Sequence, residues 1–240
     1  ERAGRPNEAQ RFLHEAQITA QLDHPHVVPL HDLGVTPDGR PFFTMKLVEG
    51  RTFQDVLEDE ACSPTDPRML ADALRVLIRV CEAVAYAHSK EVLHLDLKPL
   101  NIMVGQFGQV YVMDWGLAQR IPVLRASKPG QIPRAGTPGY MSPEQARGEM
   151  QTLDARADVF SLGAILYRIL AGLPPYGLLE LAVAKERMKQ GDLLPPDVQG
   201  FHRPLPRRLV AICVKATAAN REERFGSVLE FKRALEDYLE

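Results

Sequence analysis

The sequence predicts an α+β fold in which a small sheet lies toward the N-terminus and helices make up most of the remainder. Two observations support this fold class. Apolar residues recur at helical spacing in most segments after Arg68, and short apolar runs occur in two pairs, each around a turn. A hydrophobic fraction of 45% and a charged fraction of 25% are ordinary for a folded domain and exclude a disordered chain.

The N-terminal elements follow from local sequence signals. A helix is expected over residues 7–23, because this segment contains good helix formers and ends before Pro25. Two strand-like runs follow at 27–33 and 41–48, around the turn sequence Thr36-Pro37-Asp38-Gly39. Together these runs predict an antiparallel hairpin.

Helical spacing begins again near residue 68 and predicts a helix of about five turns that ends near His88. Two short apolar runs, 102–104 and 110–113, predict a second hairpin. Residues 116–143 lack a clear period, so we expect a long functional loop there. Further helices are expected over residues 157–171, 179–190, 205–217 and 227–239.

Charge and cysteine content exclude several classes of function. The 29 Lys and Arg against 31 Asp and Glu give a net charge of −2, which does not favour nucleic-acid binding through bulk charge. No apolar run approaches the roughly 20 residues of a membrane span, and the best candidate is interrupted by Arg168. Cys62, Cys81 and Cys213 form neither a disulfide framework nor a metal-binding pattern, which favours a reducing, cytoplasmic location.

The most informative stretch is His94-Leu95-Asp96-Leu97-Lys98-Pro99-Leu100-Asn101, and Asp114-Trp115-Gly116 begins 13 residues after its end. These sequences place two carboxylates, an amide and an ammonium on loops beside a hairpin. Carboxylate and amide oxygens suit Mg²⁺, and an ammonium group can offset charge on a transferring phosphoryl group. For either of these two sequences alone, the alternative is a polar hairpin end with a structural Asp. That alternative accounts poorly for the presence of both sequences.

Five motifs in order resemble those of the eukaryotic-like (Hanks-type) serine/threonine protein kinases, from Asn7 to the C-terminus. HLDLKPLN resembles the catalytic loop, DWG the metal-binding motif, and GTPGYMSPE the segment that ends in APE. DVFSLG resembles the start of a long buried helix, and Arg224 a late arginine that pairs with the APE glutamate. The amino-acid sequences of residues 15–34 and 112–119 are most similar to those of bacterial members. The resemblance implies part of an N-terminal lobe over 1–48 and a mostly helical C-terminal lobe over 49–240.

The resemblance also implies catalytic roles. Asp96 would accept or orient the proton of the substrate hydroxyl, and Lys98 would steady the γ-phosphate of ATP. Asn101 and Asp114 would hold Mg²⁺, or Mn²⁺ in its place. Glu15 corresponds to the glutamate of the mobile helix, although periodicity alone would make it a solvated charge.

The same resemblance places an adenine pocket around the second predicted strand. Met45 would gate the back of the pocket, and the hinge would contain Lys46, Leu47 and Val48, whose backbone groups bind the adenine edge. Met103 would form part of the pocket floor. Such apolar residues would be core in any fold, so this assignment depends on the resemblance.

Four further residues match structural or docking positions of the family. Thr137 corresponds to the threonine of the substrate-docking loop, although a turn residue is the alternative, because Gly and Pro surround it. Glu144 would pair with Arg224. Asp158 would begin the buried helix that supports the catalytic loop.

The chain departs from the family pattern at its start. The glycine-rich loop is absent, and so is the lysine that would pair with Glu15: residues 1–14 contain no Lys and only Gly4. Either the chain is a fragment of a complete kinase, or the natural protein lacks this part. The first residue, Glu1 rather than Met, and the intact motifs favour a fragment. We expect this polypeptide by itself to bind nucleotide poorly and to transfer phosphate slowly.

Two departures lie in the motifs themselves. Leu95 stands where most members have an Arg that pairs with a phosphorylated activation-loop residue. Because leucine cannot form that pair, and Ser127 is the only hydroxyl residue between Gly116 and Gly136, we expect no phosphorylation switch by this route. Trp115 replaces Phe, and its N–H is expected to need a partner when buried.

The preferred interpretation is a protein kinase that uses ATP to phosphorylate Ser and Thr of protein substrates, because Lys98 follows Asp96 at the spacing of that branch. A pseudokinase or interaction module with the same fold is one alternative, and the retained catalytic residues argue against it. A small-molecule phosphotransferase is another, and the GTPGYMSPE segment argues against it. Neither nucleic acid nor a membrane segment within this chain is expected, although a membrane anchor elsewhere in a longer protein is compatible with this interpretation.

Overall fold

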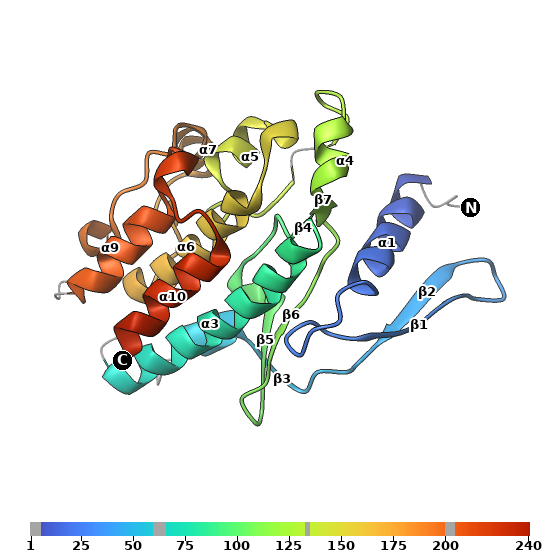
Figure 1. The fold of residues 1–240 in the computed structure, drawn as a ribbon, viewed down its shortest axis with the longest axis horizontal. Helices are drawn as coiled ribbons and strands as arrows, with labels where there is room; N and C mark the ends of the chain where they lie inside the picture. The colour runs from blue at the N-terminus through green and yellow to red at the C-terminus, as the bar shows by residue number, and fades with distance from the viewer. Residues whose placement is uncertain (1–5, 60–65, 133–134, 200–204) are drawn as a thin grey trace.

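The computed structural model describes residues 6–59, 66–132, 135–199 and 205–240. It confirms the predicted α+β class, with a largely helical body and small sheets (Figure 1). The helices are α1 (Pro6–Thr19), α2 (Phe53–Glu58), α3 (Pro67–Ser89), α4 (Ile121–Ala126), α5 (Pro143–Arg147), α6 (Ala155–Ala171), α7 (Leu181–Gln190), α8 (Pro196–Gln199), α9 (Arg207–Ala216) and α10 (Val228–Leu239). The strands are β1 (Leu30–Val35), β2 (Pro41–Met45), β3 (Gly50–Thr52), β4 (Val92–Leu93), β5 (Ile102–Gly105), β6 (Val110–Val112) and β7 (Gln119–Arg120).

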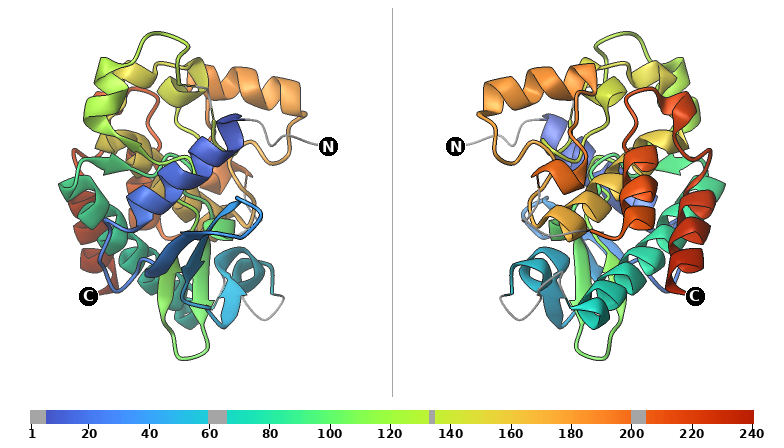
Figure 2. Two further views of the ribbon diagram at one scale, coloured as in Figure 1. Left: turned by 90° about the vertical axis from the view of Figure 1, so that its right-hand side faces the viewer. Right: turned by 90° about the vertical axis from the view of Figure 1, so that its left-hand side faces the viewer.

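The N-terminal part contains α1 and the β1–β2 hairpin, which lie to one side of the helical body (Figures 1 and 2). The hairpin is antiparallel and turns at Gly39, whose φ is +82°. α1 covers the hairpin, with Phe12 stacked on Phe43 at 4.6 Å between ring centroids. The predicted helix was too long at its C-terminal end, because α1 ends at Thr19 and the chain then tightens through i→i−3 hydrogen bonds.

The predicted strand boundaries of this hairpin were also shifted. β1 covers residues 30–35 rather than 27–33, and β2 ends at residue 45 rather than 48. Val27 instead forms an isolated parallel bridge to Val112 on β6, and the carbonyl of His26 accepts a 2.8 Å hydrogen bond from the N–H of Val112. These contacts join the N-terminal part to the second hairpin.

The body of the molecule is built around α6, which is buried around nearly its whole circumference and packs against α3, α9 and α10. A helix that is apolar on all sides belongs in an interior, and this one lies among the other helices in both further views (Figure 2). All four long helices predicted after residue 116 are present, with ends that differ by a few residues. The same holds for α3, which begins at Pro67 behind an Asp66 cap.

The β5–β6 hairpin is present as predicted, with Ile102 opposite Val112. The sequence did not predict β3 or α2, which follow the first hairpin. β3 pairs with β5, placing Gly50 opposite Gly105, and a capping box between Thr52 and Asp55 starts α2. Both elements are too short to show a period in the sequence.

The predicted loop over 116–143 has more structure than expected. β7 pairs with β4, and α4 follows it directly. Leu124 of α4 is fully buried in an apolar cluster with Leu93, Leu95 and Leu153. Packing onto this cluster, rather than helical periodicity, accounts for the order in this segment.

The described residues bear on the membrane-span and cysteine expectations. Within these ranges, no helix combines the length and apolar character that a membrane crossing needs. Cys81 and Cys213 are buried free thiols, and burial raises the pKa of both. Cys62 lies outside the described residues.

The close crossing of α6 and α9 depends on Gly163. A Cβ at this position would lie 2.6 Å from the Cβ of Ala216 and 2.9 Å from Cγ2 of Thr217. We therefore predict that Gly163→Ala lowers the free energy of unfolding by about 1–3 kcal/mol. Denaturant unfolding followed by the fluorescence of the single Trp measures the change. Gly226→Ala is the control, because its Cβ would meet only the flexible Glu230 side chain. Equal stability of the two variants would contradict the prediction.

Candidate active site

The loop between β4 and β5 carries a buried carboxylate that contacts three predicted site residues. Oδ1 of Asp96 accepts a 2.7 Å hydrogen bond from the hydroxyl of Thr137. Oδ2 accepts one of 2.6 Å from Nζ of Lys98 and a longer one of 3.3 Å from the amide of Asn101. Nζ of Lys98 also donates to the Thr137 hydroxyl at 2.7 Å. The structure therefore brings these four residues together in one polar cluster.

This cluster has a definite chemical capacity. The Thr137 hydroxyl lies at hydrogen-bond distance from Asp96, so the geometry already accommodates an alcohol against this carboxylate. A carboxylate in this position can orient a hydroxyl group and accept its proton. The ammonium group of Lys98 lies beside the same oxygens and can stabilise negative charge that develops on an attacked group.

Asp158, the first acidic residue of α6, holds the backbone of this loop. Its Oδ2 accepts hydrogen bonds from the backbone N–H of His94 at 2.9 Å and from the ring of His88 at 2.8 Å. Its Oδ1 accepts one of 2.9 Å from the N–H of Leu95. Leu95 has a φ of +64°, a left-handed conformation that residues with a Cβ rarely adopt without external support. The buried carboxylate supplies part of that support.

Asp158 is fully buried, which by itself raises the pKa of its carboxyl group. The hydrogen bond from His88, the nearby His88 and His94 side chains and the backbone N–H of His94 outweigh burial and lower this pKa overall. Asp158 is therefore held as a carboxylate. The predicted role of Asp158 at the start of a buried helix agrees with these contacts.

His94 is also fully buried, and burial is the main cause of its lowered pKa. Its Nδ1 accepts from the backbone N–H of Asp96 at 3.3 Å, so Nε2 carries the proton and donates to the carbonyl of Met113 at 3.1 Å. The neutral imidazole thus connects the loop of Asp96 to the residue before Asp114.

Asn101 and Asp114 form the oxygen-rich part of the site. The N–H of Met113 bonds the carbonyl of Asn101 at 2.8 Å, which places Asp114 next to Asn101 at the end of the β5–β6 hairpin. The N–H₂ group of the Asn101 amide donates to Asp96, and its oxygen accepts no hydrogen bond from another described residue. Asp114 is exposed, and one of its oxygens accepts only a 3.3 Å bond from Gly116.

These two oxygen donors fit a divalent cation that completes its shell with phosphate oxygens and water. Mg²⁺ binds proteins through one or two such groups rather than through a dedicated cage. The described residues contain no cluster of three or more His, Cys, Asp or Glu side chains suited to a metal.

Glu15 on α1 faces the same region. A Cβ on Gly116 would lie 3.2 Å from Oε2 of Glu15 and 3.1 Å from Oδ1 of Asp114, so both carboxylates flank this glycine. Burial, and then repulsion from Asp114, raises the pKa of Glu15. No cation pairs with Glu15 in the described part of the chain. The neighbouring His14 bonds the carbonyl of Ala118 at 2.9 Å and attaches α1 to this segment.

The predicted hinge residues follow β2. Met45 ends that strand and is half-buried. The N–H of Lys46 donates a 3.1 Å hydrogen bond to the carbonyl of Pro29. Leu47 and Val48 make no backbone hydrogen bond to another described residue. Met103 lies on β5, half-buried, opposite Tyr111.

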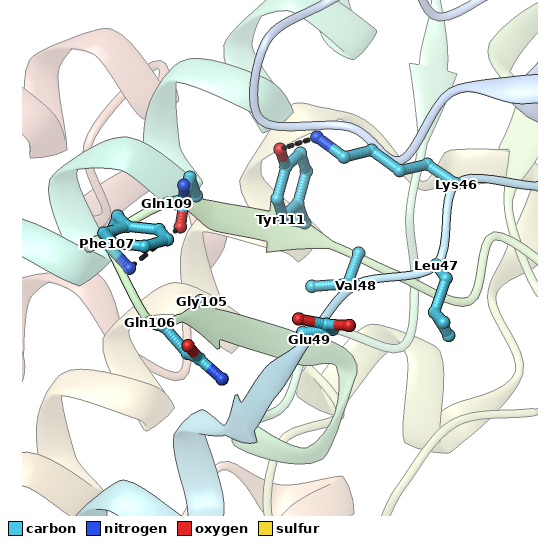
Figure 3. A pocket seen from close by; sticks show the side chains of 9 residues that line it. All are labelled: Lys46, Leu47, Val48, Glu49, Gly105, Gln106, Phe107, Gln109 and Tyr111. Atoms are coloured by element: carbon cyan, nitrogen blue, oxygen red, sulfur yellow. Dashed lines mark hydrogen bonds between the residues drawn. The ribbon is translucent and has the colours of Figure 1, made fainter.

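Figure 3 shows the pocket that the hinge side chains line. Lys46, Leu47 and Val48 line a pocket of about 200 Å³ together with Glu49 and the tip of the β5–β6 hairpin. Lys46 turns toward Tyr111 and donates a 2.7 Å hydrogen bond to its hydroxyl. Among the described residues, no hydrogen bond or ion pair joins Lys46, Leu47 or Val48 to Asp96 or Asp114.

The predicted pair of Glu144 and Arg224 is present as a buried bidentate ion pair. Its two hydrogen bonds are 2.7 and 2.9 Å long, and both side chains are at most 5% exposed. Arg224 also donates to three backbone carbonyls, at Arg156, Ala218 and Ala219. The pair fastens α5 to the segment between α9 and α10.

Sequence reasoning missed some residues that shape the site and misjudged one. His14 and Gln145 bond backbone carbonyls far away in the sequence, and no local pattern signals such contacts. The N–H of buried Trp115 was expected to find a partner, but it has none among the described residues. Trp115 instead packs its ring against His94, with centroids 4.6 Å apart.

Comparison with known proteins identifies the relatives of the chain. Residues 1–225 match the protein kinase domain. The chain is 35% identical to the serine/threonine-protein kinase PknD of Protochlamydia amoebophila, over 98% of this chain and 26% of that protein. It is 38% identical to the serine/threonine-protein kinase PknB of Mycolicibacterium smegmatis and of Mycobacterium tuberculosis, over 94% of this chain and 35% of each relative. The chain thus spans about a third or less of the length of these relatives.

The buried His94 predicts a loss of stability in mild acid. Its folded-state pKa lies below the ordinary value of 6.5, so below about pH 6.5 the unfolded chain binds a proton that the folded chain excludes. Because the unfolded state then binds more protons, stability falls as the pH falls, by up to about 2 kcal/mol between pH 7 and pH 5. His24, whose pKa is lowered by burial, adds to this effect, whereas the lowered pKa of Asp158 acts only below about pH 4.

Denaturant unfolding at several pH values measures this dependence. We expect His94→Gln to reduce the slope of unfolding free energy against pH, whatever its effect on stability at pH 8. His31→Gln, at an exposed histidine, is expected to leave the slope unchanged. Equal slopes in the wild type and His94→Gln would refute the role of His94.

Proposed function

The chain belongs to the protein kinase family, and from this premise we propose that it transfers the γ-phosphoryl group of ATP to serine and threonine hydroxyls of proteins. The observation that carries the proposal is the contact of Asp96 with both the Lys98 ammonium and the Thr137 hydroxyl. This cluster combines a proton acceptor, a cation and a position for an alcohol within hydrogen-bond distance. Phosphoryl transfer needs mainly such positioning and charge stabilisation.

In the proposed reaction, the substrate hydroxyl binds the Asp96 carboxylate beside the Thr137 hydroxyl. Asp96 orients this hydroxyl and accepts its proton as the new bond to the γ-phosphorus forms, while the bond from that phosphorus to the ADP oxygen breaks and ADP leaves. Lys98 stabilises the negative charge of the transferring group. Because Thr137 bonds both residues, it keeps the carboxylate and the ammonium in register.

Protein kinases in general use ATP and a divalent metal ion, and we assign Mg²⁺ to Asn101 and Asp114, with Mn²⁺ as a substitute. The amide oxygen of Asn101, which accepts no hydrogen bond from a described residue, and the exposed carboxylate of Asp114 support this assignment. The bound cation supplies charge neutralisation on the phosphate oxygens. Mg²⁺ and Mn²⁺ both suit such oxygen donors.

We assign the adenine edge to the backbone of the 46–48 segment, with Met45 and Met103 beside the ring. The backbone groups of Leu47 and Val48, which bond no other described residue, support this assignment. A lobe boundary between residues 48 and 49, a cytoplasmic location and the absence of nucleic-acid partners stay predictions.

A pseudokinase or interaction module is the second candidate, and one observation favours it. Glu15 faces Asp114 without a cation among the described residues, and this repulsion weakens the part of the site that would hold phosphate. We therefore expect slow turnover, and the experiment below separates slow catalysis from none.

We predict that Asp96→Asn lowers the rate of phosphoryl transfer by about 10²- to 10⁴-fold, because the amide cannot accept the proton. Transfer of radiolabelled phosphate from ATP to a Ser- and Thr-rich protein, at high enzyme concentration with Mg²⁺, measures the rate. Asp237→Asn, at an exposed position on α10, is expected to match the wild type. Equal rates in the wild type and Asp96→Asn would exclude the proposed reaction and favour the pseudokinase.

We also predict that Ser127 is not an activating phosphorylation site. Its hydroxyl donates to the carbonyl of Leu124 at 2.7 Å, and the nearby catalytic-loop position is the buried Leu95, which cannot bind phosphate. Ser127→Ala is expected to retain the rate within about twofold, apart from a small capping loss. Ser89→Ala removes the same kind of hydrogen bond elsewhere and is the control. A large rise in rate after phosphorylation of Ser127 would contradict this prediction.

A further inference from the structure

The backbone N–H and C=O of Leu95, which lie on either side of its Cα, are both held by distant side chains. The N–H of Leu95 bonds Asp158, and the carbonyl oxygen of Leu95 accepts a 2.6 Å hydrogen bond from Nε2 of Gln145. That carbonyl belongs to the same planar peptide unit as the N–H of Asp96. The bond from Gln145 therefore sets the direction in which Asp96 leaves the left-handed residue before it.

The same amide group bonds the backbone near Thr137. Nε2 of Gln145 donates its second hydrogen to the carbonyl of Ala135 at 3.1 Å. Two residues later, Thr137 contacts both Asp96 and Lys98. One side-chain amide thus connects the backbone before Asp96 with the backbone before Thr137.

The surroundings of Gln145 favour this use of its two N–H donors. The side chain is fully buried, and its Oε1 has no hydrogen-bond partner among the described residues. A buried acceptor without a partner is unfavourable, so the two donated bonds must account for the presence of the amide. Space is also restricted, because a Cβ on Gly136 would lie 3.2 Å from both Nε2 of Gln145 and the carbonyl oxygen of Leu95.

The position of Gln145 is itself secured from neighbouring residues. Its own N–H bonds the Ser142 hydroxyl that caps α5, and the preceding residue, Glu144, forms the buried ion pair with Arg224. α5 is therefore anchored on one side to the helical body, while Gln145 extends from it to the catalytic loop.

We propose that Gln145 is a positioning residue for phosphoryl transfer, which holds the Asp96 and Thr137 backbones in register without touching either substrate. This inference rests on the proposed function and extends it to a residue outside the polar cluster. A donor of two hydrogen bonds is required at this position, and a side chain of the same size without donors does not replace it.

The first test compares Gln145→Met with the wild type in phosphoryl transfer. Methionine keeps the length of the side chain and removes both donors. We expect kcat to fall by about 10- to 100-fold, because small displacements of reacting groups are costly, while KM for ATP changes less than about threefold. Gln190→Met, at an exposed glutamine on α7, is expected to leave both constants unchanged. A kcat of Gln145→Met within twofold of the wild type would overturn the proposal.

Gln145→Glu separates hydrogen-bond donation from packing. Only its protonated carboxyl can donate, and the ionised form places a negative charge against two carbonyl oxygens. We expect the activity of this variant relative to the wild type to rise as the pH is lowered from 8 to 6, while the ratio for Gln145→Met stays flat. A flat ratio in both variants would indicate a packing role alone and would overturn the proposal.

Hydrogen exchange gives a readout that does not depend on catalysis. In Gln145→Met we expect amide exchange at Asp96 and Thr137 to be at least about tenfold faster, with exchange at Leu235 in α10 unchanged. If the wild type transfers no phosphate but exchange accelerates in this way, the proposed function fails and the positioning role stands. Unchanged exchange at both sites would overturn the positioning role, whatever the activity.

Discussion

The buried carboxylate of Asp158 is the interaction on which the active-site geometry depends. A carboxylate removed from water is costly unless hydrogen bonds replace its hydration, and three donors do so here. Two of those donors are consecutive backbone N–H groups of the catalytic loop. The same hydrogen bonds therefore stabilise the buried charge of Asp158 and support the left-handed backbone of Leu95. α6, which carries Asp158, is buried along nearly its whole length, so the loop is anchored to the interior of the molecule.

The segment from Gly116 to Arg147 is attached to this frame by three kinds of interaction. Leu124 is buried in the apolar cluster that contains Leu95, the position where a cationic residue would otherwise bind a phosphate. Glu144 and Arg224 form a buried ion pair, in which loss of one partner would leave the other charge uncompensated. Gln145 adds neutral hydrogen bonds between the segment and the loop. Packing and internal bonds therefore hold the described parts of this segment, residues 116–132 and 135–147, against the body.

The N-terminal part contacts the body at several points. These contacts include the β-bridge of Val27 to Val112, the hydrogen bond of His14 to Ala118, and the apolar cluster that Ile18 and Leu22 share with Trp115. Glu15 and Asp114, which repel each other across Gly116, lie at this junction. A cation near the two carboxylates would relieve that repulsion, so charge at the junction affects how α1 sits on the body.

The sequence by itself determined the α+β class, the order of the long helices, both hairpins and the residues of the polar cluster. These features depend on local periodicity, turn residues and short motifs, which can be recognised within a few tens of residues. Only the tertiary structure decided the left-handed φ of Leu95, the packing of α4, the brief strand β3 and the two bonds of Gln145. Each depends on groups far away along the chain, such as the pair of Gln145 and Leu95, 50 residues apart. Local propensity cannot encode such contacts, because they exist only after the helices around α6 have packed.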